Sequence, residues 1–157
     1  MLDIRRLTQT AADWDRNPFV SKRMHHEAAY ALLRVAFGMV FLVAGFGKLM
    51  GGVGNIAGQQ AQQFAGILPE FFVIAFFYVL PFIELITGVL IVSGLFNIQA
   101  LIISGLLLIA LIFGTLIKGD FPTAAHNVFY ALVNSALLWF ADYNRYSLGQ
   151  LLRRGRF

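Results

Sequence analysis

Glu84 has the clearest potential for chemistry in this sequence, because it is an acidic side chain within an apolar segment. It lies in the stretch VLPFIELITGVLIVSGLF, residues 79–96, shortly after Pro81. A carboxylate at the centre of a bilayer costs roughly 3 kcal/mol on insertion scales. Pro81 removes a backbone donor and predicts a kink in the same helix. Thr87 and Gly88 fall on nearly the same face as Glu84, so this face is polar and has room for a neighbouring helix.

A stripe in the preceding apolar segment could balance this carboxylate. Intervals of three and four residues put five side chains on one helix face: Arg34, Gly38, Phe41, Gly45 and Lys48. The glycines allow another helix to approach closely. Each cation could extend to the membrane surface or pair inside the bundle. We expect Lys48 to extend to the surface and Arg34 to pair with Glu84, since a paired ion is tolerated where a lone one is not.

The last apolar segment carries a further group of polar side chains. Asn127, Tyr130 and Asn134 fall on one helix face, with His126 at its margin. Such residues often only hydrogen-bond one membrane helix to another. Asn134 lies at a depth similar to that of Glu84, however. Together with the charged residues of the first two segments, this face therefore predicts a polar site between the helices.

A flat ring with hydrogen-bond acceptors would suit the predicted site. The site comprises Arg34, Lys48, Glu84, His126, Asn127, Tyr130 and Asn134, with structural roles for Gly38, Gly45, Pro81 and Gly88. A quinone could stack on the phenylalanines, of which the chain has 16, and its carbonyls could accept hydrogen bonds from Tyr, His, Asn or Arg. A lipid headgroup or a small polar solute fits the same residues. We predict no catalytic residue and no metal ion here.

The composition is that of an integral membrane protein. Of the 157 residues, 59% are hydrophobic and 13% are charged, whereas soluble domains average about 25% charged residues. The mean hydropathy is +0.72. The chain has no cysteine, which excludes disulfides, cysteine-ligated iron–sulfur clusters and thiol redox chemistry within it. Only His126 lies in a predicted span, so an intrinsic haem held by two histidines is not expected.

Four apolar segments are long enough to cross a bilayer, at residues 28–49, 71–96, 99–117 and 122–143. An even number of spans places both termini on one side. Most of the basic residues lie in the tails, residues 1–27 and 147–157, which the positive-inside rule assigns to the cytoplasm. We therefore predict an all-α, antiparallel four-helix membrane bundle over residues 28–146, with both termini cytoplasmic.

The segments outside the predicted spans suggest surface roles. Basic residues that flank spans meet lipid headgroups, so no nucleic-acid partner is expected. No cleavable signal peptide is expected either, because the first apolar run begins near Ala28. The amphipathic tail, residues 1–27, would lie on the inner headgroups or dock on a partner subunit. The loop at residues 51–70, with Ile56 and Phe64, favours a short surface helix that caps the bundle over one that acts as a substrate lid.

Three stretches resemble the DoxX family of small four-span membrane proteins, which is similar to the small subunit of thiosulfate:quinone oxidoreductase. They are LLRVAFGMVFLVAGFGKL, LPFIELITGVLIVSGLF and ADYNRYSLGQLL, and the likeness extends over roughly residues 31–152. The resemblance implies a four-helix membrane bundle and, in some members, association with quinone-linked redox complexes. The positions of this sequence that match the pattern of the family are Arg34, Gly38, Gly45, Lys48, Pro81, Glu84 and Gly94.

These features favour an accessory subunit of an electron-transfer or respiratory-type membrane complex, not catalytic alone, that holds a quinone or lipid. The expected partners are the lipid bilayer and other integral-membrane or redox subunits, in the cytoplasmic (inner) membrane of a bacterium or archaeon. A stand-alone quinone-reducing oxidoreductase is the alternative, disfavoured because the chain supplies no redox centre of its own. A small-solute transporter is a third, and the short chain without an inverted repeat argues against it.

Overall fold

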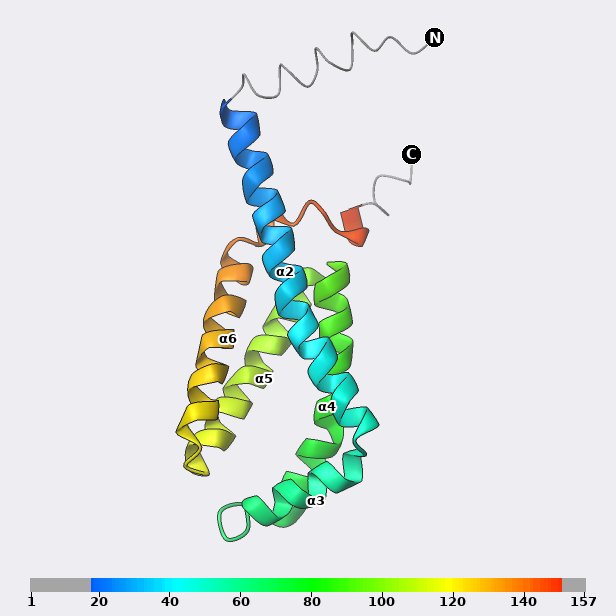
Figure 1. Cartoon of the computed structure of the whole chain (residues 1–157), viewed down its shortest axis with the longest axis vertical. Helices are drawn as coiled ribbons and strands as arrows, with labels where there is room; N and C mark the ends of the chain where they lie inside the picture. The colour runs from blue at the N-terminus through cyan, green and yellow to red at the C-terminus, as the bar shows by residue number, and fades with distance from the viewer. Residues whose placement is uncertain (1–17, 151–157) are drawn as a thin grey trace.

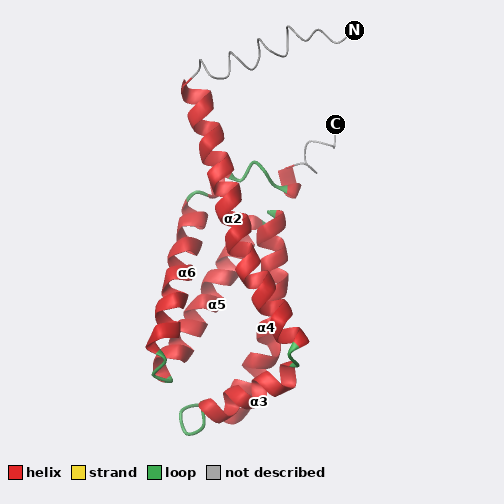
Figure 2. Cartoon of the chain, in the orientation of Figure 1, coloured by secondary structure: helices red, strands yellow, loops and turns green. Residues whose placement is uncertain are grey.

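The structure, a computed structural model, describes residues 18–150, which form helices joined by turns and loops, with no strand in that range (Figures 1 and 2). The predicted all-α class is therefore confirmed. The elements are α2 (Pro18–Met50), α3 (Val53–Gln63), α4 (Glu70–Ser93), α5 (Asn97–Ile117), α6 (Phe121–Trp139) and the 3₁₀ turn η1 (Ala141–Tyr143). The part of the predicted N-terminal tail before Pro18 lies outside the described residues.

The first helix is longer than the predicted first span. It begins at Pro18 instead of Ala28, where a proline suits the first turn because its missing N–H has no helical partner there. Residues 18–27, assigned above to the tail, thus continue the helix of the first span. In contrast, α4 ends earlier than predicted, at Ser93, since Gly94 adopts a left-handed conformation with φ of +70°.

The long helices form two antiparallel pairs. Helix α2 packs along α4, and α5 packs along α6, whereas the contacts from one pair to the other are sparser (Figure 1). We call the end that holds the start of α2 and residues 140–150 the tail end. We call the opposite end, where α3 packs on the first turns of α4, the α3 end. The helix predicted in the loop at residues 51–70 is α3.

Three helices are long and apolar enough to cross a membrane, within the described part of the chain. They cover residues Lys22–Met50, Glu70–Ser93 and Asn97–Ile117. Their outward faces carry large apolar side chains, such as Leu106, which is 64% exposed, and Ile109, which is 63% exposed. Such a surface needs lipid around it. Helix α6 has 19 residues but is not among these three helices, so the fourth span and the side of the termini remain predictions.

Glycines set the distance between α2 and α4. A Cβ atom on Gly45 would lie 2.6 Å from the backbone nitrogen of Leu85, and one on Gly88 would lie 2.5 Å from that of Leu42. The two backbones are therefore so close at these points that no side chain larger than that of glycine fits at either position. Pro81 is buried beside this contact, and α4 continues through it as one helix. Gly38 faces Ile91 and Val92 further toward the tail end.

The main core lies toward the tail end and draws on all four long helices. Its largest fully buried side chains include Leu80, Ile91, Leu101, Leu108 and Leu137. A second, smaller cluster of Ala61, Phe64 and Val73 fastens α3 to α4 at the other end. Between the two clusters the helix pairs are less tightly packed against each other, and the candidate site lies there.

Candidate functional site

A cavity of about 540 Å³ separates the two helix pairs on the α3 side of the main core. This volume is within the range of about 300–1,000 Å³ that is usual for small-molecule sites. Its walls come from every long helix and from α3. They include Val40, Phe41, Ala44, Lys48, Gln60, Phe64, Leu68, Phe72, Val73, Phe76, Phe77, Leu80, Glu84, Leu108, Leu111, Phe113, Gly114, Thr115, Lys118, Asp120, Thr123, Asn127 and Tyr130.

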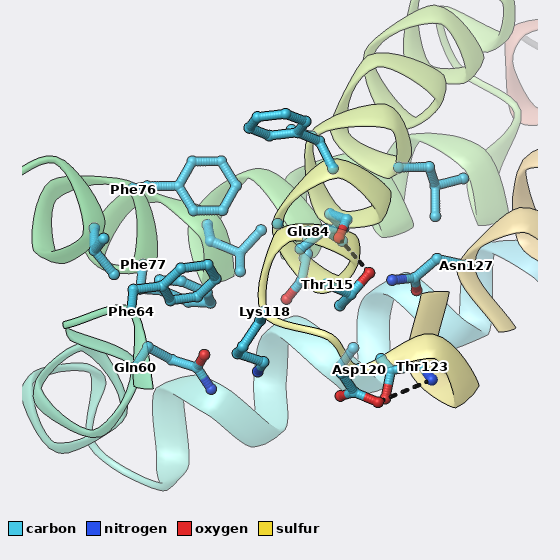
Figure 3. A pocket seen from close by; sticks show the side chains of 18 of the residues that line it. Gln60, Phe64, Phe76, Phe77, Glu84, Thr115, Lys118, Asp120, Thr123 and Asn127 are labelled. Atoms are coloured by element: carbon cyan, nitrogen blue, oxygen red, sulfur yellow. Dashed lines mark hydrogen bonds between the residues drawn. The ribbon is translucent and has the colours of Figure 1, made fainter. Parts of the chain in front are cut away.

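The cavity walls differ in character from one side to the other. Phe64, Phe76 and Phe77 line the side formed by α3 and α4, whereas Thr115 and Asn127 lie on the side formed by α5 and α6 (Figure 3). Aromatic rings form flat apolar walls that favour stacking with another ring. The opposite side adds polar groups at the edge of an otherwise apolar space, so a ligand that is apolar with a few hydrogen-bonding groups would fit best.

An ion pair joins α2 and α4 in the wall of the cavity. The Nζ atom of Lys48 lies 2.7 Å from Oε1 and 2.6 Å from Oε2 of Glu84. The side chain of Glu84 is 6% exposed and that of Lys48 is 29% exposed. The carboxylate is thus bound by both of its oxygens to one ammonium group, which makes a charge at this depth tolerable. Both residues line the cavity, and Lys48 is the more exposed of the two.

The expected pairing of Glu84 with Arg34 is wrong, and the direction of helical side chains explains why. Each Cα–Cβ bond in a helix tilts toward the N-terminus of that helix. Lys48, near the C-terminal end of α2, therefore leans back into the bundle and reaches Glu84 instead of the membrane surface. Arg34 leans away from Glu84, toward the tail end.

Arg34 binds the segment after η1 and does not line the cavity. Its Nη1 donates to Oδ1 of Asn144 at 3.0 Å, and its Nη2 donates to the carbonyl of Tyr146 at 2.8 Å. The residue is only 3% exposed, and its Nε has no partner among the described residues. Gly94 lies against the guanidinium and leaves no space for a Cβ atom. Arg34 thus fastens residues 144–146 across the tail end.

Asn134 connects α5 and α6 and also lies outside the cavity. It accepts a hydrogen bond from the hydroxyl of Ser104 at 2.8 Å, and its Nδ2 donates to the carbonyl of Leu101 at 3.0 Å. This is the interhelical role that membrane asparagines often have. A second such contact, from Asn97 to the hydroxyl of Tyr30 at 2.7 Å, joins α5 to α2. A hydroxyl in an apolar span was the sequence signal for Ser104, whereas Asn97 lies between two predicted spans, where a polar residue is expected; neither was predicted to join helices.

The remaining predicted residues divide between the cavity and the surface. Asn127 and Tyr130 line the cavity with Lys48 and Glu84. His126 is exposed, with its Nδ1 3.0 Å from the carbonyl of Pro122, one turn earlier in the same helix. No cluster of His, Cys, Asp and Glu suited to a metal ion occurs among the described residues.

A lysine crosses the mouth of the cavity at the α3 end. Lys118, just after α5, donates to Oε1 of Gln63 at 2.7 Å, and its Nζ lies 5.5 Å from the centre of the Phe64 ring. It thereby connects the α5–α6 pair to the end of α3. Nearby, Asp120 accepts a hydrogen bond from the backbone of Thr123 at the start of α6. Hydrogen bonds from Thr123, and to a lesser extent the charge of Lys118, lower the pKa of Asp120 below its ordinary value.

The helices, their apolar surfaces and the buried ion pair define an integral membrane protein of the all-α class. A family model described as "Methylamine utilisation protein MauE" matches residues 26–120. The match covers more than half of the chain, so the chain belongs to this family. A search of curated proteins found no match, and a search of solved structures found none either.

The family match corrects the resemblance to the DoxX family, which was wrong. MauE is a different family of membrane proteins. The resemblance depended on glycines, a proline and charged residues in the first two spans. Close packing of α2 on α4 requires small residues at Gly45 and Gly88, and a buried carboxylate requires a cation. Such residues recur wherever small membrane bundles meet the same physical demands, so they do not specify one family.

Proposed function

We propose that this chain is an accessory integral-membrane protein of a methylamine-utilisation system. In this proposal it holds a largely apolar ligand, a quinone or a lipid, between its two helix pairs. The cavity of about 540 Å³ carries the proposal, since its mostly apolar walls include the Lys48–Glu84 ion pair. Such walls favour an apolar ligand, and a few polar groups in them can orient it.

The family description supports the choice of system. The family is described by its part in methylamine utilisation, and the oxidation of an amine releases electrons that a membrane carrier can accept. The chain itself contains no cysteine. We therefore assign the redox chemistry to partner proteins and ligand binding or positioning to this chain.

The proposed location is the cytoplasmic membrane of a bacterium or archaeon. The membrane domain would cover residues 28–146, with basic tails on the cytoplasmic side, as the positive-inside rule predicts. Because α2 already begins at Pro18, part of the N-terminal tail would stand beyond the bilayer as a helix. Partner subunits could contact this extension.

Purification from native membranes in mild detergent tests the proposal. Mass spectrometry would identify the proteins and the small molecules that remain bound after extensive washing. We expect redox subunits of the amine-oxidising system to be enriched, together with a quinone or one lipid class. A chain that migrates alone and carries no more of any such molecule than an unrelated membrane protein of similar size would contradict the proposal.

A further inference from the structure

The polar groups of the cavity restrict the kind of ligand that it can hold. The Lys48 ammonium carries three N–H donors, and two of them face the two oxygens of Glu84. One donor therefore remains for a ligand. Because Glu84 is nearly fully buried and Lys48 is the more exposed partner, the pair presents this donor to the cavity. A ligand that meets it needs an acceptor oxygen.

The charge balance of the cavity favours a neutral ligand. Glu84 neutralises Lys48, and Asp120 balances Lys118, the other cation of the lining, so the cavity has no net positive charge to compensate an anionic headgroup. Burying an uncompensated charge in an apolar space is costly. A small polar solute is also disfavoured, because the walls are mostly phenylalanine and aliphatic side chains. The remaining class is an apolar, uncharged molecule with acceptor oxygens.

A second set of polar groups lies on the other helix pair. Tyr130 and Asn127 of α6 line the cavity across from the helices that carry Lys48 and Glu84. The Tyr130 hydroxyl and the Asn127 amide have no hydrogen-bond partner within residues 22–150. Both can donate. The cavity thus offers donors on both helix pairs, and Figure 3 shows Asn127 on one side and the rings of Phe64, Phe76 and Phe77 on the other.

We propose that the ligand is a flat, neutral ring with carbonyl acceptors on opposite edges, that is, a molecule of the quinone class. Lys48 Nζ donates to one carbonyl, and the Tyr130 hydroxyl or the Asn127 amide donates to the other. The phenylalanines of α3 and α4 cover the ring face. This inference rests on the proposed function, in which the cavity holds an apolar ligand, and it chooses the quinone over the lipid.

Three probes separate the hydrogen bonds from the shape of the cavity. Menadione has a fused ring with two opposite carbonyls, 2-methylnaphthalene has the same ring and methyl group without carbonyls, and lysophosphatidylcholine represents a lipid. We would measure their binding to the purified full chain by equilibrium dialysis in detergent. We expect menadione to bind about tenfold more tightly than 2-methylnaphthalene, the combined net effect of the two proposed hydrogen bonds.

Two variants assign the effect to residues. Tyr130→Phe removes only a hydroxyl and should reduce menadione affinity several-fold, by roughly the effect of one hydrogen bond, while leaving 2-methylnaphthalene affinity unchanged. Tyr143→Phe, the same change outside the cavity, should alter neither. The double change Lys48→Met with Glu84→Leu removes the ion pair without leaving an unpaired charge. It should also reduce the affinity for menadione and leave the affinity for 2-methylnaphthalene unchanged.

The outcomes distinguish this inference from the proposed function. Equal affinity for menadione and 2-methylnaphthalene, or displacement of both by lysophosphatidylcholine, would overturn the quinone inference and leave a lipid-binding cavity. Equal losses for both ring compounds in Tyr130→Phe would also overturn it, since the hydroxyl would then only shape the wall. If none of the three probes binds, the proposed function fails as well.

Discussion

Lys48 and Glu84 show how a membrane bundle can contain a carboxylate and a cation. Both oxygens of Glu84 meet the same ammonium, at 2.7 and 2.6 Å. The pair also connects α2 to α4 beside the glycine contact. Loss of one partner would leave the other charge in an apolar space, so the two residues should depend on each other far more than either depends on Arg34.

The first prediction tests this dependence with a double-mutant cycle. Glu84→Ala alone should lower the free energy of unfolding in detergent by about 3 kcal/mol, the low end for a broken buried pair because Lys48 is partly exposed. Glu84→Ala together with Lys48→Met should cost less than the sum of the two single changes.

The matched comparison combines Glu84→Ala with Arg34→Leu. Because Arg34 binds Asn144 and Tyr146 instead of Glu84, these two losses should simply add, as for independent sites. Additivity in the Lys48 cycle, with coupling in the Arg34 cycle, would mean that the ion pair is assigned to the wrong cation.

At the scale of the helix, the close contact of α2 with α4 depends on glycines, which have no side chain to hold the two backbones apart. The second prediction compares two glycines of α2 that lie two positions apart. Gly45→Ala would place a methyl group against the backbone of α4 and should destabilise the protein by about 1–3 kcal/mol, the usual cost of overpacking. Gly47→Ala is the control, since a Cβ atom there meets nothing within 4 Å.

The control should be neutral or slightly stabilising, because alanine favours a helix over glycine by about 1 kcal/mol. Thermal unfolding of both variants in the same detergent measures the difference. Equal melting temperatures for Gly45→Ala and Gly47→Ala would show that the two helices do not approach as closely as described.

The start of α6 provides a third prediction, which concerns pH. Asp120 caps this helix, and hydrogen bonds from Thr123 lower its pKa in the folded protein. A group whose pKa is lower when folded stabilises the fold above its unfolded pKa, near 4, and loses this contribution as the pH falls through the folded value. Asp120→Ala should therefore lower the melting temperature at pH 7, and the difference from the unchanged protein should shrink below pH 4.

Asp120→Asn separates capping from charge. Asparagine also caps helices well, so this variant should be more stable than Asp120→Ala at pH 7 and should lack the additional pH dependence. A constant difference between Asp120→Ala and the unchanged protein from pH 7 to pH 3 would contradict the role of the ionised carboxylate.

For the molecule as a whole, the fourth prediction concerns its orientation in the membrane. Helix α6 has 19 residues, which is about 28 Å at 1.5 Å per residue, close to the hydrocarbon thickness of about 30 Å. We expect α6 to cross the bilayer, which places both termini on the same side. By the positive-inside rule this side, the tail end, is cytoplasmic, and α3 lies on the opposite side. Reporter fusions within the α3 loop and after residue 150 measure the two sides. Fusions on the same side would instead mean three spans.

The amount that the sequence could predict differs between the helices and the site. Apolar runs and glycine or proline breaks located the helices, because hydrophobicity and turn residues act locally. Shared helix faces put Lys48, Glu84, Asn127 and Tyr130 in one predicted site, and these four line the cavity, but the same faces also carry Arg34 and Asn134, which do not. The partner of Glu84 could not be predicted in this way, because Lys48 and Arg34 share a helix face. Their positions along α2 and the tilt of their side chains decide which of them reaches Glu84.

The cavity itself could not be predicted from periodicity. It depends on how the α5–α6 pair packs against the α2–α4 pair, to which contacts such as Lys118 with Gln63 and Asn97 with Tyr30 contribute. Those residues are distant in sequence and carry no recurring pattern. Likewise, hydrophobicity could not predict that α2 begins at Pro18, because polar residues can continue a helix beyond the bilayer.

The central claim is that a ligand occupies the cavity, and native mass spectrometry of two tryptophan variants tests it most directly. Leu111→Trp fills the cavity from α5, whereas Ile109→Trp adds the same side chain on the exposed face of that helix. We predict that the unchanged protein and Ile109→Trp retain a bound small molecule, and that Leu111→Trp loses most of it while remaining folded by circular dichroism. Equal retention in a folded Leu111→Trp variant would contradict the claim, because the molecule would then lie elsewhere.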